Sequence, residues 1–210
     1  MDLNRYIDKR RFGAYIRIFL GLLTFLVMLS VVADTIILHN SVGNLLSYFT
    51  VDSNLMVAVF LIVWGAYQLR GEDVKRVMYV RGAITLYIFI TGTLYWMYLA
   101  RPEVNVVPNE LNLLIHFVTP IFMLIDWFIV YDDRSIKFAK ALLWVTFPIL
   151  YTIYSLIRGP MVDWYPYKFL DPELAGGYLP VLTTSAKYFL IIIVLIAGLV
   201  YLPRLVKRKA

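Results

Sequence analysis

The 210-residue sequence contains no cysteine and only two histidines, and charged residues make up just 16% of it. Without cysteine, the chain has no disulfide, no cysteine-ligated zinc and no cysteine nucleophile. Soluble domains carry about 25% charged residues, whereas 61% of this chain is hydrophobic. An ordinary water-soluble enzyme is therefore excluded. With so few nitrogen and sulfur ligands, we expect neither a metal site nor a cofactor.

Short motifs of soluble enzymes are also missing from the sequence. There is no Gly-x-Ser-x-Gly nucleophile elbow, no phosphate-binding loop, no Gly-x-Gly-x-x-Gly fingerprint and no His-Glu-x-x-His zinc helix. The function must therefore be sought where polar residues interrupt the apolar runs.

Six apolar runs are each long enough to cross a hydrocarbon core of about 30 Å, which takes roughly 20 helical residues. They cover residues 15–38, 51–69, 77–99, 111–131, 138–157 and 180–202. Because a single chain in lipid must satisfy its backbone hydrogen bonds internally, all six are predicted to be helices. The sequence therefore predicts an all-α fold, in which residues 1–210 form a single transmembrane domain of six spans.

Lysine and arginine are distributed unequally between the two sides of this predicted bundle. Fifteen of the twenty lie in the two tails and in the second and fourth connections, whereas the opposite side carries only Arg101, Arg158 and Lys168. By the positive-inside rule, both termini lie in the cytoplasm and the long segment 158–179 lies outside. The net charge of +6 then reflects topology and contact with anionic membrane lipids. A nucleic-acid partner is not expected.

Polar residues inside the predicted spans are concentrated toward the outer face. They include Asp34, Thr50, Asp52, Asn54, Asn112, His116 and Lys187. An ionisable residue in a span costs about 2.5 to 3.5 kcal/mol and normally faces the bundle interior or a wet cavity. An isolated Ser or Thr, by contrast, often only bonds its own helix or a neighbouring one. The pattern predicts a polar cavity that opens toward the outer leaflet.

His116 is the only histidine inside a span, and it can exchange a proton near neutral pH. Pro120 follows four positions later and lacks the amide that would bond the His116 carbonyl. A kink at this turn is therefore predicted, with space beside the imidazole. The candidate chemistry is a hydroxyl nucleophile activated by His116. The structural alternative is a histidine that only bonds a neighbouring helix.

Other ionisable and aromatic residues in the spans have structural interpretations. Arg81 and Asp126 lie at similar depth, about one turn from the cytoplasmic ends of their spans, and are predicted to form an ion pair. Lys187 and Asp34 are candidates for a second pair near the outer face. The tryptophans near span ends are interpreted as interfacial anchors; they include Trp96, Trp127 and Trp164.

Three segments together resemble a known family. They are residues 48–54 (Tyr-Phe-Thr-Val-Asp-Ser-Asn), residues 111–116 (Leu-Asn-Leu-Leu-Ile-His) followed by Pro120 and Asp126, and residues 164–170 (Trp-Tyr-Pro-Tyr-Lys-Phe-Leu). In order and spacing, along nearly the whole chain, they resemble the androgen-induced and androgen-dependent family of integral membrane threonine hydrolases, in particular its compact bacterial relatives. One departure is that Pro120 follows His116 after three intervening residues, one fewer than in the animal members.

The resemblance implies that Thr50 is the nucleophile and His116 the base of an enzyme that cleaves lipid esters, such as fatty acid esters of hydroxy fatty acids. It also implies a bacterial cytoplasmic membrane location. Thr50 opens its span, and His116 lies about 8 Å below the outer start of another at 1.5 Å per residue, so the two share one depth. Neutral His116 would take the Thr50 proton during attack on the ester, and then activate water to release the acid.

Several polar residues are candidates for binding the substrate or the oxyanion, which is usually a large catalytic effect. They are Asn54, Asn112, Lys187, Asp52 and Asp34. The alternative function is a small-molecule or lipid carrier, in which ionisable residues of the spans bind or relay protons without catalysis. Inverted repeats and paired broken helices, which many carriers show, are not visible in the sequence. A subunit that only packs against partners is a third interpretation.

Overall fold

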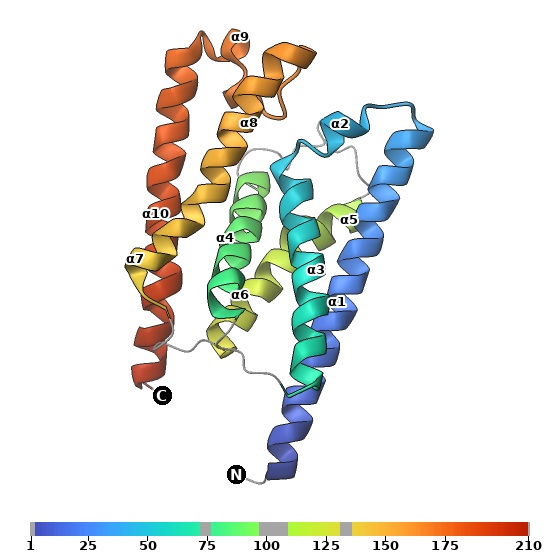
Figure 1. Cartoon of the computed structure of the whole chain (residues 1–210), viewed down its shortest axis with the longest axis vertical. Coiled ribbons are helices and arrows are strands. Elements are labelled where there is room, and N and C mark those ends of the chain that lie inside the picture. Colours follow the sequence, from blue (N-terminus) through green and yellow to red (C-terminus); the bar gives the residue numbers. More distant parts are fainter. Residues whose placement is uncertain (1–2, 72–76, 97–108, 131–135, 210) are drawn as a thin grey trace.

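The computed structural model describes residues 3–71, 77–96, 109–130 and 136–209 (Figure 1). Every element in these ranges is helical, which confirms the predicted all-α class. Four long helices are α1 (Leu3–Ile37), α3 (Phe49–Leu69), α4 (Met78–Leu94) and α10 (Tyr178–Lys209). One composite rod joins α5 (Asn109–Leu113), the π-helical turn η4 (Leu114–Val118) and α6 (Thr119–Val130); another joins α7 (Phe138–Ala141), the 3-10 turn η5 (Leu142–Val145) and α8 (Thr146–Val162).

Five of the described helices are long and apolar enough to cross a membrane. Helix α4, which corresponds to the predicted span 77–99, has 17 residues and is shorter than these five. At 1.5 Å per residue it covers about 26 Å, somewhat less than the hydrocarbon core. Residues 97–99 of the predicted span lie outside the described residues.

The helices run roughly side by side, and both ends of the chain lie at the same end of the bundle (Figure 1). We call this the terminal end. The opposite end, here the loop end, carries the short helices α2 (Val42–Leu45) and α9 (Pro172–Ala175), with the 3-10 turn η6 (Lys168–Leu170) close to α9 in the sequence. In the view of Figure 1, α3, α4 and α6 lie between α1 on one side and α8 and α10 on the other.

Small residues allow α1 and α3 to pack closely. Ala14 and Gly21 are seven residues apart on α1, and Ala58 and Gly65 are seven apart on α3. A Cβ atom on Gly21 would lie 2.9 Å from the Ala58 carbonyl oxygen, and one on Gly65 would lie 2.8 Å from the Ala14 carbonyl oxygen. Close backbone approach of this kind is how helices associate in lipid, where the hydrophobic effect does not drive them together.

Two tryptophans fill the space between α4, α6 and α10. Trp127 is fully buried, and its indole N–H donates to the Leu199 carbonyl at 2.8 Å. The interpretation of Trp127 as an interfacial anchor is therefore wrong, because its ring belongs to the core. Trp144 packs edge to face against it, with ring centroids 6.0 Å apart. A Cβ on Gly82 would lie 2.2 Å from the Trp144 ring, so only glycine fits there.

Helix α8 fixes the connection between α2 and α3 at the loop end. The hydroxyl of Tyr151 donates to the Ser47 carbonyl at 2.8 Å, and the hydroxyl of Tyr154 lies 2.8 Å from that of Ser47. One turn further on, the Arg158 guanidinium donates to the Asn44 side chain at 2.6 Å. Residues spaced by three and four lie on one helix face. This face of α8 therefore fixes the point at which α3 begins, next to Thr50.

Candidate functional site

Thr50 is the second residue of α3, and its side chain is half-buried. The residue before the helix, Tyr48, makes no side-chain capping bond, although the first amides of a helix need acceptors. The amide of Phe49 finds one in the Tyr151 hydroxyl, at 3.2 Å. The Thr50 hydroxyl is thus held in the first turn of a helix, where the helix dipole favours negative charge.

Tyr167 of the loop between α8 and α10 lies against Thr50. Its ring contacts those of Tyr48 and Tyr151, with centroids 5.8 and 6.4 Å away, and stacks on Phe169 at 5.4 Å. Burial raises the pKa of Tyr167 to about 12, while hydrogen bonds with the side chain and backbone of Thr50 act in the opposite direction. Tyr167 is therefore a neutral phenol at the Thr50 hydroxyl. The sequence contained a signal for it, because Tyr167 lies in the third segment of the family resemblance, but no role was predicted.

His116 is buried in the η4 turn, and its ring is fixed on two sides. It stacks on Tyr95 with centroids 3.7 Å apart and planes 15° apart. Its Nδ1 lies 3.3 Å from the Asn112 carbonyl oxygen of the preceding turn. When the Nδ1 proton is donated to this carbonyl, Nε2 is the basic nitrogen. The contact therefore selects the tautomer that a general base requires.

A kink with space beside the imidazole was predicted at Pro120. The structure has a π-helical turn there, and Tyr95 stacks on one face of the imidazole. Pro120 has no amide for the His116 carbonyl, and the amide of Thr119 bonds five residues back instead of four. The His116 carbonyl accepts a 3.1 Å hydrogen bond from the indole of Trp96. On the same side, a Cβ on Gly92 would lie 3.0 Å from the His116 carbonyl oxygen. Single π-helical turns of this kind are frequent at functional sites.

Asn54 links the Thr50 segment to the His116 segment. Its fully buried side-chain amide donates to the Thr50 carbonyl at 2.9 Å and to the Ile115 carbonyl at 3.3 Å. Both amide hydrogens are used in these bonds, so the predicted role of Asn54 as an oxyanion donor is not supported by its geometry. Its Oδ1 has no partner among the described residues. Asn54 is a bridge between α3 and the rod that carries His116.

A second polar link joins α3 to α4 near the same level. The hydroxyls of Ser53 and Thr91 lie 2.7 Å apart, and both side chains are buried.

Two further predicted site residues, Asp52 and Asn112, lie near Thr50 and His116 in the sequence. Asp52 is half-buried in the first turn of α3. Asn112 is buried one turn before His116 and supplies the carbonyl that faces its Nδ1. Within the described contacts no hydrogen bond joins Thr50 to His116, and their catalytic pairing stays a prediction.

Two predicted site residues lie elsewhere. Asp34 is exposed on α1 and Lys187 is exposed on α10, and these helices occupy opposite sides of the bundle (Figure 1). The predicted pairing of Lys187 with Asp34 is therefore wrong, and neither residue is placed to bind an oxyanion at Thr50. Hydropathy fixes the depth of a residue along its span, but not the direction in which it faces around the bundle.

The predicted ion pair near the terminal end is confirmed, with an additional member. The Arg81 guanidinium lies 3.0 Å from the Asp126 carboxylate. Arg17 of α1 pairs with the other oxygen of the same carboxylate and donates to Gln68 at 2.7 Å. Both guanidinium groups lie over the Trp64 ring, 4.3 and 4.5 Å from its centroid. The cluster joins α1, α3, α4 and α6, and its members are buried.

Arg17 was missed because the charge count places it with the N-terminal tail. The available signal was its position inside the first apolar run, where a cation requires a partner. Among the described residues, no group of three or more His, Asp or Glu side chains has the arrangement of a metal site.

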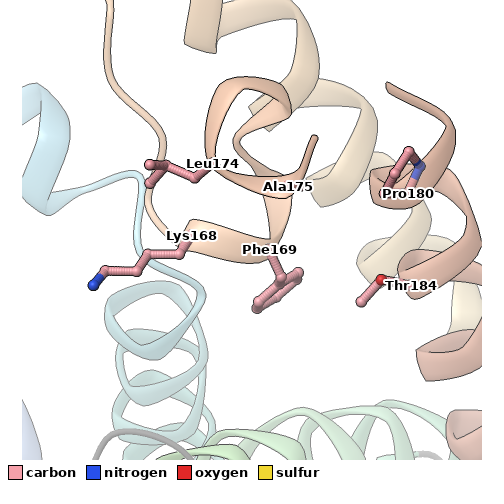
Figure 2. Close-up of a pocket in the computed structure, with 6 residues that line it drawn as sticks. All are labelled: Lys168, Phe169, Leu174, Ala175, Pro180 and Thr184. Atoms are coloured by element: carbon pink, nitrogen blue, oxygen red, sulfur yellow. The ribbon is translucent and has the colours of Figure 1, made fainter. Parts of the chain in front are cut away.

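A pocket of about 500 Å³ opens at the loop end (Figure 2). It lies between the segment that carries η6 and α9 and the first turns of α10, and it is lined by Lys168, Phe169, Leu174, Ala175, Pro180 and Thr184. Neither Thr50 nor His116 lines it. This pocket is therefore not the polar cavity expected around Thr50 and His116, and that cavity stays a prediction.

No family model, curated protein or solved structure matches the chain. The functional assignment therefore rests on the geometry of these residues and on the resemblance of the three segments.

Proposed function

We propose that the protein is an integral membrane hydrolase of lipid esters, in which Thr50 is the nucleophile and His116 the general base. The observation that carries this proposal is the Asn54 bridge. One buried amide bonds both the Thr50 carbonyl and the Ile115 carbonyl, so the two candidate residues lie on backbone segments held by a common side chain. The fixed tautomer of His116 and the first-turn position of Thr50 add to it.

In the proposed reaction, Nε2 of His116 accepts the proton of the Thr50 hydroxyl while the oxygen attacks the ester carbonyl. The tetrahedral intermediate collapses to an acyl-threonine, and the leaving alcohol takes the proton from His116. Water, deprotonated by the same nitrogen, then attacks the acyl group, and the fatty acid and the Thr50 hydroxyl are released. Fatty acid esters of hydroxy fatty acids are the substrate class that the family resemblance favours.

Tyr167 acts in this proposal as a positioning residue. Its neutral phenol hydrogen-bonds with Thr50 and limits the rotation of the threonine hydroxyl. The ring itself is held by Tyr48, Tyr151 and Phe169. A catalytic group must be held close to its productive geometry by the residues around it.

The proposed topology has six crossings, with both termini in the cytoplasm and the loop end in the outer leaflet of a bacterial cytoplasmic membrane. The unequal distribution of lysine and arginine supports this orientation. The position of both chain ends at one end of the bundle agrees with an even number of crossings (Figure 1).

A carrier is the second candidate, because polar residues continue along α6 from His116 toward the terminal end. The hydroxyls of Thr119 and Thr24 lie 3.4 Å apart, and Asp126 follows two turns later in the charged cluster. Met123, however, is fully buried between Thr119 and Asp126. This apolar side chain interrupts the polar stripe that a carrier would use, so the hydrolase is favoured.

The proposal is tested by ester hydrolysis with purified protein in lipid nanodiscs. Thr50→Ala and His116→Ala are each expected to lower kcat/KM at least about 1,000-fold, with the double variant no worse than either, because residues that act as a unit are not additive. Thr50→Ser should retain part of the activity. Thr183→Ala is the matched control, since Thr183 is exposed and bonds only its own helix, at the Leu179 carbonyl. Undiminished turnover by Thr50→Ala would exclude this nucleophile.

A further inference from the structure

The charged cluster near the terminal end contains more positive than negative charge. Arg17 and Arg81 both pair with Asp126, and among the described residues no other carboxylate forms an ion pair with either of them. Arginine stays protonated in proteins. Two guanidinium charges against one carboxylate charge leave one positive charge without a counterion.

Burial makes this excess charge unfavourable. Arg81 is completely buried, and the exposed fraction of Arg17 is only 5%. A charge removed from water needs a counterion and hydrogen bonds in place of its hydration. The Trp64 ring under both guanidinium groups offsets part of this cost through cation–π attraction. The ring has no net charge, however, so the excess remains.

Three N–H groups of the cluster also lack an acceptor. They are Nε of Arg17, Nε of Arg81 and Nε1 of Trp64, and each is buried without a hydrogen-bond partner in the part of the chain that the structure describes. The two guanidinium carbons lie 4.3 and 4.5 Å from the Trp64 ring centroid, so the three donors belong to one site. Buried donors without acceptors are rare in proteins and call for an explanation such as a bound water or ion.

The charge of the cluster favours an anion over water. A water molecule accepts hydrogen bonds but leaves the positive charge uncompensated, whereas a monovalent anion accepts them and neutralises the charge. A divalent anion would only reverse the sign of the excess. The three nitrogens are covered by protein atoms, so the ion must be small, and the long arginine side chains must shift to admit it.

The cluster lies close to the aqueous phase at the terminal end. Gln68, which accepts from Arg17 at 2.7 Å, is the last residue but one of α3. Arg81 lies in the first turn of α4, and Asp126 lies four residues before the end of α6. At 1.5 Å per residue, these positions are within about 6 Å of the ends of their helices. An ion from the aqueous phase can reach them without crossing the centre of the bilayer.

We infer that the charged cluster binds a small monovalent anion of the size of chloride, which accepts from the Nε–H groups of Arg17 and Arg81 and from the indole N–H of Trp64. The bound anion would connect α1, α4 and α3, to which these three residues belong, and stabilise their packing. The site shares no residue with Thr50 and His116, so the inference does not depend on the proposed hydrolase.

The binding experiment uses the full-length protein in phosphatidylcholine nanodiscs and radioactive chloride in a scintillation proximity assay. Gluconate, which is too large for the site, keeps the ionic strength constant. The wild type is expected to bind a single chloride ion saturably. Arg17→Met removes the excess charge and should abolish this binding. Trp64→Phe keeps an aromatic ring and all charges but removes one donor, and should weaken binding about tenfold, as expected for one hydrogen bond to a charged group.

Two matched controls should bind chloride like the wild type. Trp164→Phe alters the other tryptophan over which an arginine lies, because the guanidinium of Arg158 is 5.6 Å from its ring at the loop end. Lys140→Gln removes an exposed cation of α7 that has no contact with the cluster among the described residues. Loss of binding in either control would overturn the assignment, because the ion would then bind elsewhere.

Asp126→Asn distinguishes a binding site from a general salt effect. This variant raises the excess from one to two positive charges, so chloride should bind more tightly although the protein is less stable. A ligand that binds only the folded protein raises its stability. The gain in melting temperature on replacing gluconate by chloride should therefore be present in the wild type, absent in Arg17→Met and largest in Asp126→Asn.

Two results would overturn the inference. One is a wild-type protein that binds no chloride saturably and melts at the same temperature in chloride and gluconate. The other is chloride binding that is unchanged in both Arg17→Met and Trp64→Phe. All proteins are first purified as monodisperse species by size-exclusion chromatography. If Arg17→Met yields none, Trp64→Phe decides, because it leaves every charge of the cluster in place.

Discussion

The indole nitrogen of Trp96 donates a 3.1 Å hydrogen bond to the carbonyl oxygen of His116. This oxygen lacks its usual helical partner because residue 120 is a proline, and the helix widens to a π-helical turn at the same place. The turn that presents the imidazole is thus defined by a missing amide on one side and, on the other, by the indole of Trp96, two residues beyond the end of α4. The surroundings of His116 therefore include its own helix and the two residues, Tyr95 and Trp96, that follow α4.

Pro120→Ala is expected to change this turn without damaging the core. An alanine amide would compete with the Trp96 indole for the His116 carbonyl and favour a regular α-helix, which rotates the imidazole away from its present position. Hydrolysis should fall about tenfold, a cost of about 1.4 kcal/mol in transition-state stabilisation, while the melting temperature stays equal or rises. The measurements are kcat/KM and thermal unfolding in detergent.

Trp96→Phe is the matched variant, because it removes the indole donor and leaves the proline in place. It should lower activity less than Pro120→Ala. If Pro120→Ala and wild type had the same activity, the π-helical turn would have no part in presenting the base.

The extent of the spans was predictable from the sequence, because the length of an apolar run is set by the bilayer. The predicted run 51–69 and the helix Phe49–Leu69 differ by only two residues at one end. The similar depth of Arg81 and Asp126 in the membrane was predictable as well, because the position of a residue along its span sets its depth. The direction in which each side chain faces was not, since it depends on which helices become neighbours.

Three residues illustrate this limit. Trp127 was expected at the interface because tryptophan near a span end usually anchors there, yet its ring is in the core. Arg17 was counted with the tail, although α1 extends from Leu3 and places it opposite Asp126. Tyr167 reaches Thr50 only because the loop after α8 folds back over the start of α3, a long-range contact without a periodic signal.

Tyr167→Phe is expected to lower ester hydrolysis about two- to tenfold, because one hydrogen bond worth about 0.5 to 1.5 kcal/mol is lost at Thr50. Since burial raises the pKa of Tyr167 to about 12, its hydroxyl stays protonated across any practical assay. The pH profile of kcat should therefore keep its shape in the variant and only drop in height. Tyr165→Phe is the control, with no contact to Thr50 described. A profile that lost its alkaline limb in Tyr167→Phe would show that the phenol itself ionises during turnover.

The charged cluster predicts an unequal response to removal of its members. Asp126→Asn leaves two buried guanidinium groups without a counterion and should destabilise the protein by about 3 to 5 kcal/mol. Arg17→Met leaves the Arg81 and Asp126 pair intact, so it should cost less. Thermal unfolding in detergent measures both.

The charge reversal of Arg81 and Asp126 together is a separate test. Because Arg17 also faces residue 126, this double variant would bring two arginines into contact, and no rescue of stability is expected. Rescue by that double reversal would show that Arg17 is not part of the cluster in the membrane.

The orientation of the bundle can be tested with single cysteines, since the chain has none of its own. Glu173 is exposed in α9 at the loop end, and Lys140 is exposed in α7 on a segment that the charge distribution places in the cytoplasm. Neither position carries a hydrogen bond from its side chain in the described contacts, so Glu173→Cys and Lys140→Cys should leave the fold unchanged. An impermeant maleimide added to intact spheroplasts is expected to label Glu173→Cys at once and Lys140→Cys only after lysis, because the positive-inside rule places the loop end outside. The reverse pattern would invert the molecule, move Thr50 to the cytoplasmic leaflet and require the lipid substrate to arrive from that side.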